Sequence, residues 1–281
     1  MNKWIFLTLM MLMICVSGIL FFSKTDNVPT FSYFPLDEQS HFIKTDSDLR
    51  LDSSKITWTS DSKSDKNMYL RQDASLLFDN GKLRGVRSKW EQNKEKIGIK
   101  ETLSFKGSSL FQVISFHHGE IHTSNDQIKS IQDMSDASLY VVDSPSHSVL
   151  AFESPVNDSD TAWKNLIDKT VKQELLVSWH QLFKHFDIPI ESYLAVPLTN
   201  LYKYNKEPLP SMSQEETNQV IGQLWEGLYK NYIIPATKTK NNQGNNYIPI
   251  ILFDKNHKQL LVLFELNGKK QKLIQKYPHN E

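Results

Sequence analysis

Cysteine is nearly absent from this chain. The 281 residues include a single one, Cys15, which falls inside an apolar amino-terminal run. The residues beyond that run have no thiol, so they form no disulfide bond. A cysteine nucleophile and a zinc site with cysteine ligands are excluded there for the same reason.

Neither sign of charge is in excess, and arginine is scarce. The 32 Lys and Arg residues balance the 32 Asp and Glu residues, only four of them are arginines, and no dense basic patch occurs. Proteins that bind nucleic acids neutralise phosphates with such patches. We therefore expect no nucleic-acid partner.

Long apolar runs are lacking except for one near the amino terminus. Residues 4–22 contain no charged side chain and are bracketed by Lys3 and Lys24. At about 1.5 Å of rise per helical residue, such a run spans roughly 28 Å, close to the ~30 Å hydrocarbon layer of a bilayer. The sequence therefore predicts a transmembrane signal anchor at residues 1–24, with membrane lipid as its partner.

A cleaved secretory signal is the alternative to this anchor, and it would leave a secreted protein. Residues 4–14 are long enough for its apolar core, and residues 16–18 are small enough for cleavage. The apolar run continues to Phe22, however, so cleavage would leave large apolar residues at a new terminus. Lipid attachment at Cys15 is disfavoured because Ile14 stands where such sites have a small residue.

The charges beside the anchor favour a short cytoplasmic tail and an extracytoplasmic carboxy-terminal part, since Asp26 dilutes the effect of Lys24 on the far side. We therefore expect a single-pass protein of the cell membrane. The chain beyond the anchor divides into a juxtamembrane segment (25–55), an antiparallel β-rich region (56–156) and an α+β region (157–281) that packs on or beside it.

The β-rich region is predicted from alternating apolar residues and turn signals. Asn80-Gly81 is the clearest of these signals, because a two-residue hairpin turn requires positive φ at both positions. This turn places Phe78 opposite Leu83. Residues 44–67, rich in Ser, Asp and Lys, are predicted to be solvated loops around one short strand at 56–59.

The last region is predicted to contain two helices and a meander. One helix is expected over 162–186, with Asp158, Ser159 or Asp160 as its N-cap. The second begins at Ser213 with a capping box to Glu216 and stops at Pro235. A three-stranded meander near 248–276 follows, with a turn at 267–268. The predicted class is therefore α+β: a membrane helix, a mostly antiparallel β region and a helix-containing α+β region that ends in the meander.

Four residues carry the main prediction of a chemical site: His117, His118, Glu120 and His122. If the segment is one strand, His118, Glu120 and His122 share a face, because side chains alternate. If residues 118–119 instead form a hairpin turn, His117 pairs with Glu120, Ser115 pairs with His122, and these four share a face. Either set could hold a divalent metal such as zinc or place a general base beside a carboxylate, and an exposed polar turn without a site is the simpler interpretation.

The sequence contains no Gly-x-Ser-x-Gly elbow, and Asp143, Ser146 and His147 are too close in sequence to converge as a triad. The layout of a short tail, one membrane helix and an extracytoplasmic part resembles the accessory proteins that modulate bacterial sensor kinases or envelope processes, without a shared motif. We expect a membrane-anchored interaction or regulatory protein of the cell envelope, without catalytic activity or cofactor and with a protein partner near the membrane. The alternative is a surface hydrolase or metal-binding enzyme built on the cluster at 117–122.

Overall fold

Strands dominate the structure. The computed structural model describes residues 34–52, 54–123, 127–145, 148–237 and 246–277, and strands make up 51% of it. The predicted α+β class is therefore wrong, and the protein is mostly β. The α-helices of the described residues are α2 (Asp158–Phe186), α3 (Gln214–Leu228) and the single turn α4 (Ile234–Thr237).

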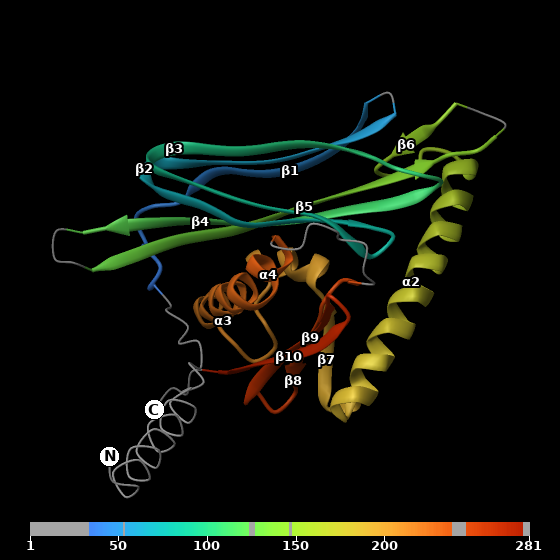
Figure 1. The fold of residues 1–281 in the computed structure, drawn as a ribbon. Coiled ribbons are helices and arrows are strands. Elements are labelled where there is room, and N and C mark those ends of the chain that lie inside the picture. The colour runs from blue at the N-terminus through green and yellow to red at the C-terminus, as the bar shows by residue number, and fades with distance from the viewer. Residues whose placement is uncertain (1–33, 53, 124–126, 146–147, 238–245, 278–281) are drawn as a thin grey trace, which may run out of the picture. The chain divides into compact units, whose positions relative to one another are not determined.

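The first sheet contains six antiparallel strands in two layers (Figure 1). Its strands are β1 (Phe42–Asp52), β2 (Lys55–Asp79), β3 (Lys82–Ser104), β4 (Ser109–His122), β5 (Ile128–Val142) and β6 (Leu150–Phe152). The first part of β2 pairs with β1 and with the end of β3, whereas its last part pairs with β4 and with the start of β3. Shifts of register between Lys63 and Ser75 mark the bend that joins the layers, as expected of β-bulges.

The loops predicted within residues 44–67 are wrong, because these residues form most of β1 and the first part of β2. The short strand predicted at 56–59 is confirmed as part of β2. Period-2 alternation is present, but serine takes inward positions where an apolar residue is expected. Ser60, Ser62 and Ser64 are all buried. Small hydroxyl side chains fit between closely packed layers, so a strand that reads as polar lies in the interior of the protein.

The second sheet has four antiparallel strands in the order β10-β9-β8-β7. They are β7 (Tyr193–Pro197), β8 (Ile250–Asp254), β9 (Gln259–Leu266) and β10 (Lys269–Lys276). The last three form the predicted meander, and Glu265 lies opposite Lys270 as expected from the turn at 267–268. Strand β7 is not predicted from the sequence.

Helix α3 contacts both sheets (Figure 1). Trp225 stacks on Phe116 of β4, with ring centroids 5.2 Å apart, and the Gln275 side chain of β10 donates a hydrogen bond to the Val220 carbonyl. Helix α2 also contacts both sheets: the Tyr140 hydroxyl of β5 donates to the Asp168 carboxylate at 2.8 Å, and Trp179 Nε1 donates at 2.8 Å to the carbonyl of Ile248, just before β8. The largest hydrophobic core is shared by both sheets and both helices.

The helix ends agree only in part with the sequence prediction. The capping box between Ser213 and Glu216 is confirmed. The N-cap of α2 is Asn157, one residue earlier than predicted, and its side chain accepts from the Asp160 amide. Pro235 does not stop α3: the chain continues through a π turn (Tyr229–Ile233) into α4. A proline inside a helix lacks an amide donor and its ring crowds the preceding turn, and here the π turn occupies that preceding turn and the helical run ends two residues later, at Thr237.

No helix in the described ranges is both long and apolar enough to cross a membrane. The anchor predicted at residues 1–24 lies outside the described residues, as do residues 25–33 of the predicted juxtamembrane segment. Residues on both sides of the predicted boundary at 156 belong to one compact unit, Tyr33–Glu281.

Candidate functional site

The predicted histidine and glutamate residues lie on strand β4, which is continuous from Ser109 to His122 and pairs with β5 along its whole length. The alternative with a turn at residues 118–119 is therefore wrong. His118, Glu120 and His122 share the face of β4 that also carries Phe116, and His117 points to the opposite face. The structure brings three of the four predicted residues together.

Glu120 occupies the centre of this group and is 7% exposed. Its carboxylate oxygens lie 3.4 Å from His122 Nε2 and 3.9 Å from His118 Nδ1. The His122 ring is tilted against Tyr69, and Tyr69 stacks on Trp90 with centroids 5.6 Å apart. Trp90 is 58% exposed, so this cluster reaches the surface through an aromatic pair.

Aromatic stacking holds His118 against the core. The His118 ring stacks on Phe116, which stacks on Trp225. Among the described residues, no group of three or more His, Cys, Asp or Glu side chains has an arrangement suited to holding a metal ion. The metal site at His118, Glu120 and His122 stays a prediction from the sequence.

His117 is fully buried between the two layers of the first sheet. Its Nε2 atom lies 2.7 Å from Ser135 Oγ, and Nδ1 has no hydrogen-bond partner within the described ranges. Burial lowers the pKa of His117 from 6.5 to about 3, because a charged imidazolium there would lose its hydration. His117 is therefore neutral at physiological pH and separate from the cluster around Glu120.

A chain of buried hydroxyl groups continues from His117 through the interior. Ser135 Oγ lies 2.7 Å from Ser47 Oγ, which donates to Ser115 Oγ at 2.9 Å. Ser115 Oγ lies 2.7 Å from Ser75 Oγ, and Ser75 accepts from Trp58 Nε1 at 3.2 Å. Because Ser47 and Trp58 belong to the layer that packs over β4 and β5, this chain joins the layers with paired polar groups.

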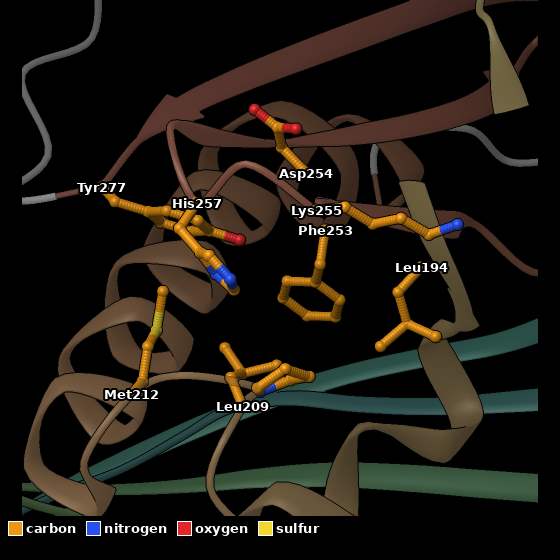
Figure 2. Close-up of a pocket in the computed structure, with 9 residues that line it drawn as sticks. Leu194, Leu209, Met212, Phe253, Asp254, Lys255, His257 and Tyr277 are labelled. Atoms are coloured by element: carbon orange, nitrogen blue, oxygen red, sulfur yellow. The ribbon is translucent and has the colours of Figure 1, made fainter. Parts of the chain in front are cut away.

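An apolar pocket of about 110 Å³ opens at one end of the second sheet. Figure 2 shows Phe253 at its centre, with Leu194 and Lys255 to one side and Met212, His257 and Tyr277 to the other. The remaining lining residues are Leu209, Pro210 and Asp254. The pocket thus lies between β7, β8 and the connection that leads into α3.

Local hydrogen bonds position the polar rim of the pocket. Asp254 accepts from the Asn256 amide at 2.9 Å, and its carbonyl accepts from the His257 amide at 3.0 Å. Lys255 Nζ donates to the Glu191 carbonyl at 2.7 Å, which draws that side chain toward the start of β7. Burial, with a further contribution from the negative charge of Asp254, raises the pKa of Tyr277 above its usual range, so its hydroxyl stays protonated.

Strand β7 forms one side of this pocket and one edge of the sheet. Leu194 lies opposite Phe253 in the register and is 38% exposed. The five residues of β7 include no charged side chain, whereas β10, at the other edge, carries four lysines. At one edge of the sheet, the charged side chains of β10 oppose pairing with another strand. The other edge, β7, carries no charge and lies next to an apolar pocket.

Sequence reasoning misses this pocket because its residues come from four separate segments and form no local motif. The only local signals are an apolar stretch at 193–197, too short to separate from the end of the preceding helix, and Pro210 within a loop.

No family model matches the chain, and no curated protein or solved structure matches it either.

Proposed function

We propose that the protein is an extracytoplasmic interaction or regulatory module without catalytic activity, held at the cell membrane by residues 1–24. The observation that carries the proposal is the apolar pocket beside the uncharged edge of β7. The layout that the sequence predicts is a short tail, one membrane helix and an extracytoplasmic part. Accessory factors of envelope proteins or of sensor kinases have this layout.

The size of the pocket favours a side chain over a metabolite. Sites for small molecules usually enclose ~300–1,000 Å³, whereas this pocket encloses about 110 Å³. An engineered cavity of ~150 Å³ holds one benzene molecule. A single aliphatic side chain of a partner is therefore the group that fits, and anchors of this kind supply much of the free energy of protein association.

Attachment to a membrane would support such a modest contact. A pocket for one side chain, with a short edge strand beside it, offers a small interface of the kind found in transient complexes. Holding both partners near one bilayer raises their effective concentration without any new contact. The anchor and the pocket thus serve one function in this proposal.

Site-specific photo-crosslinking tests the proposal in membranes of cells that express the full chain. A photoreactive residue at His257 replaces an exposed side chain of the pocket rim. The matched control is Ile274, which is 50% exposed and lies on the opposite face of the same sheet. We expect a defined protein adduct from position 257 that is absent from position 274.

A second substitution shows whether this adduct depends on the pocket. Leu194→Asp places a carboxylate in the apolar wall and should abolish the adduct from position 257. Equal adducts from positions 257 and 274, or an adduct that persists with Leu194→Asp, would contradict the proposal.

A further inference from the structure

We propose that a groove between the start of β3 and the segment from the π turn to α4 binds the headgroup of an anionic phospholipid in the membrane that holds the chain. This inference rests on the membrane attachment in the proposed function. It adds a contact with the bilayer beyond residues 1–24 and does not involve the apolar pocket of the second sheet.

The groove has the size of a site for a small molecule. It encloses about 500 Å³, and such sites usually enclose ~300–1,000 Å³. Its two walls are residues 84–88 and Trp90 of β3 on one side, and Tyr229, Ala236 and Thr237 on the other. The charged side chains of this lining are Arg84 and Arg87, two of the four arginines in the chain. The lining therefore favours an anion.

A β-bulge brings the two arginines to the same side of β3. Leu83 and Gly85 pair with consecutive residues of β2, so Arg84 between them is an extra residue in the strand. In a regular strand, residues three positions apart point to opposite faces. The bulge changes this alternation, and both Arg84 and Arg87 line the groove.

Acidic partners hold both guanidinium groups in place from outside the groove lining. Arg87 Nε donates to Glu101 at 2.8 Å, and Arg84 Nε lies 3.6 Å from Asp79 Oδ2. The Arg84 and Arg87 side chains are still 43% and 47% exposed. Because a guanidinium has five N–H donors, each arginine can also donate to a phosphate, which arginine often binds through two parallel hydrogen bonds.

An aromatic pair lies at one end of the groove. Trp90 is 58% exposed and stacks on Tyr69, and Trp and Tyr rings are enriched where a membrane meets water. Arg87 precedes Trp90 by three residues, which is about 10 Å of extended strand. The polar layer of one leaflet is roughly 5–8 Å thick. An indole placed in that layer therefore brings Arg87 to the level of the phosphates.

The chain enters the first sheet close to this aromatic pair. Leu36 pairs with Ser130 of β5, which lies opposite Glu120 of β4. Glu120 in turn lies opposite Tyr69 of β2. Neighbouring strands are about 4.8 Å apart, so this row is roughly 14 Å wide. Residues 25–33 span at most about 32 Å, so an anchor at residues 1–24 keeps this end of the groove within reach of the bilayer.

Photo-crosslinking to lipid tests this inference with the full chain in nanodiscs. A photoreactive residue at Thr237, an exposed position of the groove, should give a phospholipid adduct in mass spectra when the nanodiscs contain phosphatidylglycerol. The yield should fall roughly fivefold or more in nanodiscs of phosphatidylcholine alone. Position 166 is the control, because Leu166 is 56% exposed on α2, and it should give little adduct in either.

Substitution of the arginines shows whether the adduct depends on their charge. Each basic side chain near an anionic surface strengthens binding roughly fivefold, so Arg84→Gln with Arg87→Gln should lower the yield from position 237 about tenfold or more. Arg50→Gln, which alters an ion-paired side chain that is 76% exposed on β1, should leave it unchanged. Equal adducts from positions 237 and 166, or a yield that stays the same without phosphatidylglycerol or without the two arginines, would overturn the inference.

Failure of the headgroup site is distinguishable from failure of the proposed function. A chain that stays in nanodiscs but gives no lipid adduct from position 237 lacks the headgroup site, while crosslinking from position 257 still tests the proposed function. A chain that does not stay in nanodiscs contradicts the membrane attachment and this inference together. A protein adduct from position 237 in cell membranes, in place of the lipid adduct, would assign the groove to an acidic partner segment and overturn the inference.

Discussion

Buried hydroxyl groups and one neutral histidine hold the two layers of the first sheet together. Five of these side chains, from Ser75 to His117, form a continuous series of hydrogen bonds across the interior. Each bond contributes about 1 kcal/mol net, but a partner left unpaired costs more, because a buried polar group without a hydrogen bond has lost its hydration. Single substitutions in this series therefore have large effects.

Ser115→Ala is expected to lower the free energy of unfolding by about 1–3 kcal/mol. Ser115 Oγ lies at the centre of the series and contacts both Ser47 Oγ and Ser75 Oγ, so its removal affects two hydroxyl groups. Urea unfolding followed by tryptophan fluorescence measures the change. Ser88→Ala, at an exposed position of β3, is the control and should stay within about 0.5 kcal/mol of the natural protein.

His117 is expected to make folding stability fall with acid. Its pKa is about 3 in the folded protein and 6.5 without burial, so below pH 6.5 the unfolded chain binds a proton that the folded protein does not. The free energy of unfolding should therefore drop by about 1 kcal/mol per pH unit from pH 6.5 toward pH 3, and it should be unaffected by this residue above pH 6.5.

Unfolding curves between pH 7 and pH 4 test this dependence. His117→Gln should flatten the slope below pH 6.5 whatever its effect on stability at pH 7. His122→Gln alters a side chain that is 57% exposed and serves as the control. An unchanged slope with His117→Gln would show that another group carries the acid sensitivity.

At the scale of elements, turns and caps follow from the sequence, whereas polar strands do not. The hairpin at Asn80-Gly81 has the predicted positive φ at both residues and places Phe78 opposite Leu83. Such signals depend on a few neighbouring residues. Strand β1 and the first part of β2 depend instead on a covering layer that makes serine suitable for the interior, and no local pattern shows that layer.

Gly81→Ala is expected to destabilise the protein more than Gly107→Ala. Both glycines have positive φ, +76° and +68°, so both substitutions carry a similar backbone cost of about 1–2 kcal/mol. A Cβ at Gly81 would lie 2.9 Å from Leu175 Cδ2, while one at Gly107 meets nothing within 4 Å. Because Leu175 is fixed in the core between α2 and the first sheet, overpacking adds about 1–3 kcal/mol at Gly81 alone.

Thermal unfolding of the two glycine variants gives this comparison directly. Equal losses would mean that Leu175 moves aside without cost and that the contact between α2 and the first hairpin is loose. A larger loss for Gly81→Ala confirms that the hairpin and the helix pack as one body.

At the scale of the whole described unit, the core and the pocket depend on contacts between distant segments. Leu194, Leu209 and Phe253 meet only because the second sheet packs against the connection that precedes α3. Sequence patterns predict the meander β8–β10 and the helix start at Ser213, but they contain no information on which loop covers the end of β8. The sequence identifies the residues of the histidine cluster at 117–122 as a candidate site, but it gives no indication of the pocket.

The two sites also differ in what they offer a partner. Glu120 is nearly buried between His118 and His122, and His118 is held by aromatic stacking. The pocket instead has an exposed apolar wall at Leu194 and an uncharged edge strand beside it. The pocket and β7 therefore form the surface on which the proposed function depends.

Photo-crosslinking from position 257, in membranes of cells that express the full chain, tests this central claim most directly. The account predicts a defined protein adduct from position 257 that Leu194→Asp abolishes and that position 274 does not give. An adduct that persists with Leu194→Asp, or equal adducts from positions 257 and 274, would contradict the account.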